Sequence, residues 1–270
     1  MTGYSHHECN QETETIQVRC ARIEEGNERP LEDVVPVEDA VTVLLNGEPI
    51  ADVTVSPGNL KEFAVGYLIY LGAIASAEDI DEITAGGGSV DITCPHIQRG
   101  AIRETIPGRD PGTPETAPMI RKVDSRLRVT VHDISRAIGQ VTESNVHRLT
   151  GGVHTCGLFR PSGSRDLAAA SICSDVGRHN AMDKVIGAAV LQGCRLGSCF
   201  AAATGRASSD MVFKCRMAGI PLLASRGATT SLAIRISRES GITLIAFARP
   251  NRMNIYCNRE RVIADDGLRG

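Results

Sequence analysis

The sequence is poor in features that nucleic-acid and membrane binding require. Its 270 residues include no tryptophan, five phenylalanines and four tyrosines, so aromatic platforms for stacking single-stranded bases are scarce. The 29 basic and 32 acidic side chains give a net charge of −3, which provides no whole-chain attraction to a polyanion or a membrane surface. We therefore expect neither nucleic acid nor a membrane as a partner.

Long apolar runs are absent too. The longest uncharged stretch, residues 63–77, has 15 residues, whereas a membrane-spanning helix needs about 18 or more. The N-terminal residues are polar and acidic, without the basic n-region and apolar h-region of a secretory signal. We therefore expect a cytoplasmic protein.

The nine cysteines follow no recognisable pattern. No C-x-x-C is present, and the spacing matches neither a disulfide framework nor a zinc knuckle. Cys173, Cys199 and Cys215 lie in apolar stretches, where a free thiol usually behaves as a small buried hydrophobe. The H-x-E and P-C-x-x-C motifs of zinc deaminases, the Walker P-loop and the Rossmann G-x-G-x-x-G are also missing, so we expect no zinc, ATP hydrolysis or dinucleotide redox chemistry.

The chain has the composition of a folded globular protein. It is 42% apolar and 23% charged, which is enough to form a core. Residues 1–30 are polar and Glu-rich and indicate a loose tail or an edge strand. Two β-rich runs around Asn46-Gly47 predict a hairpin over residues 41–55, because both turn residues tolerate positive φ.

A helix and a loop are predicted next. Asn59 can cap a helix that ends near Gly72, with apolar residues at helical spacing. Residues 107–118 are rich in proline and glycine and poor in apolar side chains, which predicts an exposed, mobile loop.

The second half of the chain alternates strands and helices. A strand at 127–131 and one or two helices at about 133–148 lead into this part. We then predict strands at 167–173, 198–203, 220–224 and 242–248, and helices at 180–192, 208–218 and 230–240. Asn180 and Asp183 resemble a capping box at the first of these helices. The alternation predicts an α/β architecture with some parallel strands.

This pattern suggests a division of the chain into four parts. We expect a polar N-terminal tail (1–30), a smaller N-terminal α+β region (31–140), a C-terminal α/β domain (141–260) and a short C-terminal tail (261–270).

Three polar loops follow strands in the α/β domain, at residues 174–180, 204–209 and 225–230. Each combines glycine, arginine and hydroxyl or amide side chains and opens a helix, whose free N–H groups favour an anion. One such loop is usually no more than a turn and a helix cap. Three in succession, at the carboxyl edge of a sheet, predict a site for an anionic, nucleotide-like ligand.

Two histidine pairings within this domain are compatible with catalysis. His179 and Asp183 are four residues apart and would share one face of a helix, with Lys184 beside them, either for acid–base chemistry or simply to orient the histidine. His154 and Cys156 could form a thiol–imidazole pair, or both could be packed side chains.

Longer motifs point to one family. The runs SDVGRHNAMDKVIGAAV (174–190), TGRASSDMVFKCRMAGIPLLASRGATTSLA (204–233) and GITLIAFARPNRMNIY (241–256) closely resemble the FdhD family of formate dehydrogenase accessory sulfurtransferases. Residues 46–72 and 150–154 also resemble it, so that the likeness covers about residues 30–260 in order. It implies a homodimer whose C-terminal α/β domain is cytidine-deaminase-like, without zinc.

The resemblance also implies a function. The family binds the guanine-nucleotide ends of bis-molybdopterin guanine dinucleotide, for which a guanine nucleotide is a mimic. It passes sulfur from a cysteine desulfurase to the molybdenum or tungsten before the cofactor enters the catalytic subunit of formate dehydrogenase. Matching motifs make the expected cofactor-binding residues Gly177, Arg178, His179, Asn180, Asp183, Lys184, Gly205, Arg206, Ser208, Ser209, Lys214, Ser225 and Asn254.

The chain departs from the family at the sulfur-transfer motif. The family's C-x-x-C-type pair belongs to a loop that corresponds to residues 107–118, which contain no cysteine, although a persulfide carrier requires a thiolate. Cys94, upstream of this loop, and Cys156, near His154, are the candidate sulfur carriers, unless both are packed thiols.

Three functions therefore compete. The first is a sulfur-transferring maturation factor, and the second is a non-catalytic chaperone that holds the cofactor and docks the apo-enzyme. The third, a zinc nucleoside deaminase, is disfavoured by the missing ligands.

Overall fold

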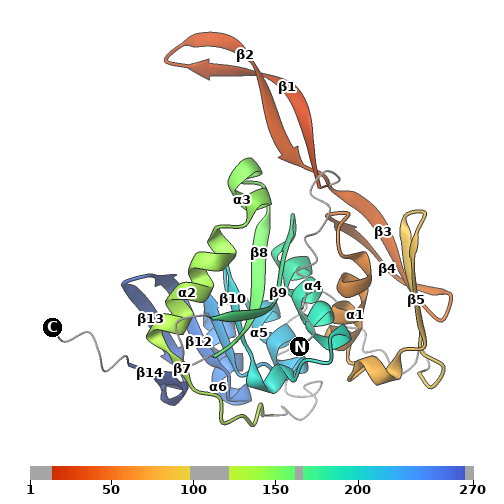
Figure 1. The fold of residues 1–270 in the computed structure, drawn as a ribbon, viewed down its shortest axis with the longest axis vertical. Coiled ribbons are helices and arrows are strands. Elements are labelled where there is room, and N and C mark those ends of the chain that lie inside the picture. Colours follow the sequence, from red (N-terminus) through yellow and green to blue (C-terminus); the bar gives the residue numbers. More distant parts are fainter. Residues whose placement is uncertain (1–13, 98–121, 162–166, 265–270) are drawn as a thin grey trace, which may run out of the picture.

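The computed structural model describes residues 14–97, 122–161 and 167–264. The predicted α/β class is confirmed: a mixed six-stranded sheet is covered by helices, and a four-stranded sheet lies beside it (Figure 1). In the described part of the chain, no helix is long and apolar enough to cross a membrane. The loop predicted at residues 107–118 lies outside the described residues.

The six-stranded sheet carries most of the C-terminal half. Its strand order is β13-β12-β11-β10-β8-β9, and its strands are β8 (His154–Arg160), β9 (Ala168–Asp175), β10 (Phe200–Ala203), β11 (Leu222–Ser225), β12 (Thr243–Arg249) and β13 (Arg252–Cys257). β10, β11 and β12 are parallel neighbours, as predicted, and β8 is antiparallel to both β9 and β10. The strands β9, β10, β11 and β12 therefore all point to one edge of the sheet.

β8 and β13 were not among the predicted strands. β8 contains Gly157, a residue that weakens a strand pattern. In the structure the ring of Phe159 fills the space above this glycine, where a Cβ atom would lie 2.6 Å from Phe159 Cε2. The absence of a side chain at Gly157 therefore leaves room for the ring of Phe159, two residues further along the same strand.

Helices cover both faces of this sheet. The side chains of β10 alternate between the two faces of the sheet. Phe200 and Ala202 belong to one core cluster, and Ala201 and Ala203 belong to the other. The helix on the first face is α2 (Val131–Thr142), with α3 (Asn145–Thr150) following it. On the second face lie α4 (Arg178–Leu191), α5 (Ser209–Met217) and α6 (Ser231–Ser240).

The four-stranded sheet belongs to the N-terminal half. Its order is β4-β3-β6-β5, with β3 (Asp39–Leu45), β4 (Glu48–Val55), β5 (Glu82–Gly86) and β6 (Ser89–Thr93). The predicted hairpin is confirmed, with Asn46 and Gly47 at φ of 54° and 79°. The Asn46 side chain also accepts from Cys94 N at 2.7 Å and donates to Cys94 O, so the turn is tied to the end of β6.

The helix predicted after Asn59 is α1 (Leu60–Leu71), and it ends at Gly72 in the left-handed conformation as expected. Its predicted cap is wrong in detail: Asn59 is itself left-handed, at φ 58°, and its side chain makes no capping hydrogen bond. A 3-10 turn at Ala77–Asp79 follows, with Ser76 and Asp79 forming the two hydrogen bonds of a capping box.

Two glycines bring α1 and α4 into backbone contact. A Cβ atom on Gly66 would overlap the carbonyl oxygen of Asp183, and one on Gly187 would overlap the carbonyl oxygen of Glu62, both far inside the 3.0 Å that real Cβ contacts keep. This approach buries α4 completely from Ala181 to Val190. The N-terminal region and the α/β region consequently share one continuous core.

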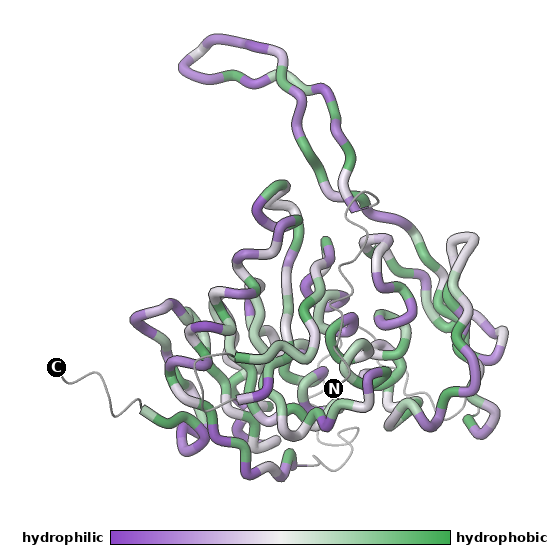
Figure 2. The backbone as a smooth tube through the Cα atoms, in the orientation of Figure 1, coloured by the Kyte–Doolittle hydropathy of each residue, from purple (hydrophilic) through white to green (hydrophobic). Residues whose placement is uncertain are grey.

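The N-terminal segment forms an arm. β1 (Thr15–Glu24) and β2 (Asn27–Pro36) pair antiparallel as a two-stranded hairpin, which projects from the body (Figure 1). Polar and apolar residues alternate along it (Figure 2), and Ile16 and Ile23 are 52% and 73% exposed. Of the two alternatives for residues 1–30, a loose tail or an edge strand, the structure supports a strand for residues 15–30, because β1 and β2 satisfy each other's backbone groups.

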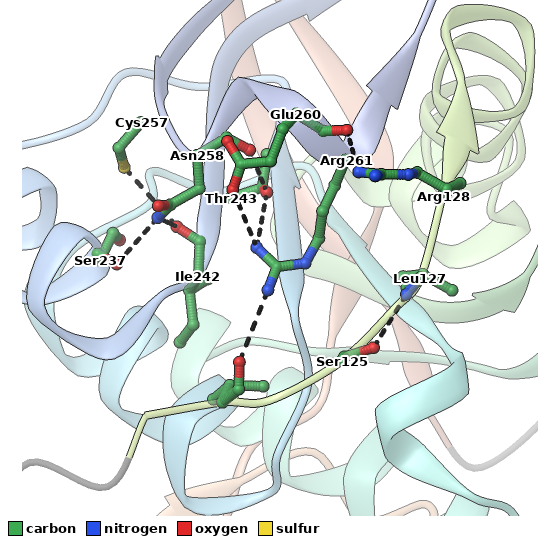
Figure 3. Close-up of polar contacts among 11 residues, drawn as sticks. Ser125, Leu127, Arg128, Ser237, Ile242, Thr243, Cys257, Asn258, Glu260 and Arg261 are labelled. Carbon is green, nitrogen blue, oxygen red and sulfur yellow. Dashed lines mark hydrogen bonds and ion pairs between the residues drawn. The ribbon is translucent and has the colours of Figure 1, made fainter.

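The last described residues, up to Ile263, are anchored to the body of the protein. Arg261, only 8% exposed, reaches Thr243 Oγ1 and Val123 O, and Arg128 donates to the carbonyl oxygen of Glu260 (Figure 3). β14 (Val262–Ile263) then pairs in parallel with the two-residue strand β7 (Val129–Thr130). The predicted tail is thus wrong for residues 261–263, while the division into domains stays a prediction.

The glycine contact between α1 and α4 yields a stability prediction. Gly66→Ala or Gly187→Ala should each lower the free energy of unfolding by about 3 kcal/mol or more, since backbone carbonyls block the added methyl. Urea denaturation checks this. The matched control is Gly139→Ala in α2, where nothing lies within 4 Å and helix propensity alone should stabilise the chain by about 0.5–1 kcal/mol. Equal effects at the three glycines would contradict the contact.

Candidate anion-binding site

The three predicted polar loops meet at one edge of the six-stranded sheet. They follow β9, β10 and β11, whose carboxyl ends point the same way. The second and third loops are bonded together, since Ala207 N donates to Ala228 O at 2.9 Å and Ser225 Oγ donates to Gly205 O at 2.5 Å. We call this surface the anion edge, and define it by residues 176–179, 204–209 and 226–229.

Close contacts at two glycines show that the first and third loops lie against the second. A Cβ atom on Gly205 would lie 3.0 Å from Arg178 Cβ and 3.2 Å from His154 Nδ1. A Cβ atom on Gly227 would lie 3.0 Å from Arg206 N. Backbone N–H groups and cationic side chains from three loops are thereby brought within one small area.

The charges at this edge are mainly positive. Burial and the charge of Arg206 lower the pKa of Arg178, and burial together with Arg226 and Arg252 lowers that of Arg249. Loss of hydration is the larger cause of both shifts, and the neighbouring arginines add to it. The Nε atom of Arg178 is also buried and has no hydrogen-bond partner, which is costly unless a ligand supplies an acceptor.

Two histidines at the edge are held neutral. Burial, then Arg178 and Lys214, lower the pKa of His179 to about 4, against a smaller opposing effect of Asp210. Burial, then Arg178, likewise lower the pKa of His154. His179 Nε2 lies 3.3 Å from Ser208 Oγ and 3.8 Å from Asp210 Oδ2. The histidine therefore links the first loop to the start of α5.

The predicted His179–Asp183 pair is not formed. Asp183 is buried and accepts two hydrogen bonds of 2.7 Å from Lys214 Nζ, which also lies 3.8 Å from the centre of the Tyr70 ring. Burial raises the pKa of Asp183 to about 6, although Lys214 opposes this. The capping box predicted for Asn180 and Asp183 is wrong as well, because α4 begins at Arg178 with Gly177 as its N-cap.

A second buried ion pair lies below the first loop. Lys184 Nζ is 2.8 Å from Asp175 Oδ2 and donates to Ser56 O at 2.8 Å, with both charged side chains fully buried. Asp175 also accepts from Ser56 N, Gly177 N and Asn180 Nδ2. The carboxylate thus ties the end of β4 to the N-terminus of α4 and holds the first loop in place.

The predicted cofactor-binding residues accordingly separate into two groups. Side chains or backbone at the anion edge belong to Gly177, Arg178, His179, Gly205, Arg206, Ser208 and Ser209. The supporting residues below it are Asn180, Asp183, Lys184, Lys214 and Ser225, all engaged by other protein groups. Asn254 lies on β13, where its Nδ2 is 3.4 Å from Tyr256 Oη. Whether these residues bind a cofactor stays a prediction.

Phe247 was not among the residues predicted to form the site. This residue has φ of 52° at a bulge in β12, is 39% exposed, and donates its N–H to Gly227 O at 2.9 Å. Such a backbone is strained for a bulky residue and is typical of functional sites. Arg249 donates to Arg226 O at 2.6 Å beside it. Local sequence carries no signal for this bend, which arises from pairing with β13.

The two candidate sulfur carriers are buried. Burial, then the charge of Asp79, raise the pKa of Cys94, and burial raises that of Cys156 well above its ordinary value. Cys156 Sγ lies 3.9 Å from Arg178 O, so no thiol–imidazole hydrogen bond with His154 explains its position. Both thiols are protonated and inaccessible in this conformation, and their assignment as carriers stays a prediction.

Among residues 14–97, 122–161 and 167–264, no group of three or more His, Cys, Asp or Glu side chains could hold a metal ion.

The neutral state of His179 predicts a pH dependence of stability. Its pKa is about 4 in the folded chain and 6.5 when unfolded, so between these values the unfolded state binds more protons. This contribution to stability is complete above pH 6.5 and is lost as the pH falls toward 4. We expect His179→Gln to lose less stability than the wild type between pH 7 and pH 5, measured by urea unfolding. Equal losses would contradict the assignment.

Known proteins resemble this chain over most of its length. Residues 36–263 match the sequence model of the FdhD/NarQ family. The chain is 34% identical over 250 residues to a protein of Methanothermobacter thermautotrophicus named sulfur carrier protein FdhD, covering 92% of this chain and 98% of the relative. It is 32% identical over 252 residues to the protein of the same name from Xanthomonas axonopodis pv. citri, covering 88% of each.

A solved structure shares the fold. The crystal structure of a protein from Desulfotalea psychrophila, described as a formate dehydrogenase accessory protein, superposes with a TM-score of 0.77 at 29% identity. The match covers 92% of this chain and 99% of the other. On the family match and these relatives, the chain belongs to the FdhD/NarQ family.

Proposed function

We propose that this protein is a sulfur carrier that serves the maturation of formate dehydrogenase. Its relatives carry the name sulfur carrier protein FdhD, and a structural neighbour is described as a formate dehydrogenase accessory protein. In this proposal the cargo is bis-molybdopterin guanine dinucleotide, bound at the anion edge through its guanine-nucleotide ends. The sulfur donor is a cysteine desulfurase, the recipient is the formate dehydrogenase catalytic subunit, and the working form is a cytoplasmic homodimer.

The unpartnered Nε of Arg178 is the observation that carries the ligand part of the proposal. A buried guanidinium nitrogen without an acceptor, next to other arginines, favours an anion that supplies several oxygens. The anion edge also presents the N-terminal turns of α4 and α5, whose free N–H groups favour phosphate. A pyrophosphate-containing nucleotide matches both features.

Phe247 supports the proposal that the ligand contains a nucleoside. It is an exposed aromatic side chain whose backbone is bonded to the third loop of the anion edge. The chain has few aromatic residues, and placing one here in a strained conformation favours a stacking function for a planar base. The phosphate end would then contact Arg178 and Arg206, while the base stacks on Phe247.

The second candidate function is a cofactor-binding chaperone that carries no sulfur. It is favoured by the burial of Cys94 and Cys156 and by the absence of a C-x-x-C pair. Both functions use the anion edge for the cargo, so nucleotide binding does not separate them. Formation of a persulfide on the chain does.

Calorimetric titration with GDP tests the anion edge. We expect binding to the wild type and an affinity about tenfold lower or worse for Arg178→Gln and Arg206→Gln, since each removes a charge-assisted hydrogen-bond donor. Arg235→Gln, an exposed arginine on α6, is the matched control and should bind GDP like the wild type. Unchanged affinity in the first two variants would exclude this surface as the nucleotide site.

Phe247 can be tested separately from the phosphate contacts. Phe247→Ala should weaken GDP binding about tenfold, because base–aromatic stacking contributes about 1–3 kcal/mol, and should leave pyrophosphate binding unchanged. Phe247→Tyr, which keeps the ring, should retain GDP affinity. Equal weakening of GDP and pyrophosphate by the alanine variant would show a structural effect rather than base stacking.

A further inference from the structure

Two thiols share one arginine at the end of β8 that lies away from the anion edge. Arg160, the last residue of β8, donates from Nη2 to Cys194 Sγ at 3.0 Å, and its side chain also hydrogen-bonds Cys199. Cys194 is partly exposed, whereas Cys199 is buried. β8 begins at His154, beside Gly205 of the anion edge, and its seven residues span roughly 20 Å.

The C-terminal end of α4 positions the first thiol. After Leu191 the chain turns at Gly193, with φ of 68°, and Cys194 N donates to Ala189 O at 2.8 Å, as in a Schellman-type helix end. Cys199 Sγ lies 3.7 Å from Arg195 O across the following 3-10 turn. A backbone hydrogen bond therefore fixes the main chain at Cys194, and Arg195 O accepts from the thiol of Cys199.

The electrostatics distinguish the two thiols. Arg160 Nη2 lies 3.0 Å from Cys194 Sγ, so a cationic donor faces this sulfur directly. Burial raises the pKa of Cys199 even though Arg160 opposes the shift. Cys194 has the features of a nucleophile, namely access to solvent and a cationic donor on its sulfur, and Cys199 has those of a protonated neighbour.

Cys20 is the other described cysteine that reaches solvent. It lies on the β1–β2 arm, in a shallow hollow lined by Arg19, Glu28 and Arg29 among others. Both arginines are already paired with carboxylates: Arg29 lies 2.9 Å from Glu24, and Arg19 lies 3.6 Å from the acidic residue opposite it, Glu32. These partners offset the positive charge near Cys20, whereas Arg160 donates from Nη2 to Cys194 Sγ itself.

We propose that Cys194 is the thiol that accepts sulfur from the donor persulfide, with Arg160 as its positioning residue. This inference rests on the proposed sulfur-carrier function and replaces the family's missing C-x-x-C pair. The Cys194 thiolate attacks the terminal sulfur of a donor cysteine persulfide, and a new S–S bond forms at Cys194. The donor's S–S bond breaks, its cysteine leaves as a thiolate, and no net oxidation or reduction occurs.

The position of this thiol site separates the donor protein from the cargo. Because Cys194 and the anion edge lie at opposite ends of β8, a desulfurase can approach the first without meeting a nucleotide bound at the second. The guanidinium of Arg160 would also stabilise the persulfide anion that forms, since it can donate to the new terminal sulfur.

Intact-mass and peptide mass spectrometry test this site. The full chain is incubated with glutathione persulfide, or with a cysteine desulfurase and L-cysteine, and all nine cysteine peptides are mapped. We expect a reducible gain of one sulfur, about 32 Da, on the Cys194 peptide. Cys194→Ala should lose the adduct, Arg160→Gln should form it about tenfold more slowly, and the matched control Cys20→Ala should behave like the wild type.

Circular dichroism and GDP affinity show that the variants are folded. If the sulfur is found on another cysteine and not on Cys194, the assignment of the thiol is overturned while the carrier function stands. If none of the nine cysteines gains sulfur in a chain that still binds GDP, the proposed carrier function is wrong. The function as a cofactor-binding chaperone then remains.

Discussion

The backbone contact between α1 and α4 is the constraint on which the remaining structure depends. Gly66 and Gly187 let two helices from different halves of the chain approach so closely that no side chain fits between them. This contact places α4 between α1 and the sheet and buries the helix on every side. Because the N-terminus of α4 carries Arg178 and His179, the position of the anion edge follows from the packing of these glycines.

A fully buried helix that carries charged residues must pair them. Asp183 and Lys184 are on α4, and unpaired charges there would cost several kcal/mol each. Lys214 of α5 neutralises the first, and Asp175 at the end of β9 neutralises the second. These pairs are satisfied within the protein, whereas Arg178 keeps a buried nitrogen without a partner. The buried charges of α4 are therefore neutralised within the protein, whereas Arg178 at its N-terminus still lacks a hydrogen-bond acceptor. Only this end of the helix is suited to an anionic ligand.

Burial also decides which cysteines can react. A thiol in an apolar core stays protonated, and its sulfur is out of reach of a donor protein. Cys94 and Cys156 are in this situation, while Cys194 lies at a helix end where the core meets solvent and an arginine contacts its sulfur. Cys194 thus combines partial exposure with a cationic partner on its sulfur.

Local patterns in the sequence determined the hairpin at Asn46-Gly47, the end of α1 at Gly72, the alternation of strands and helices, and the three loops of the anion edge. These features depend on turn chemistry, periodicity and capping, which act over a few residues. The tertiary structure alone decided that β8 lies between β9 and β10, that Phe247 bends into the left-handed region, and that Lys184 and Lys214 are buried. Lys184 donates to the carbonyl oxygen of Ser56, 128 residues away, and Lys214 pairs with Asp183, 31 residues away. No local pattern encodes contacts that form only when distant segments pack together.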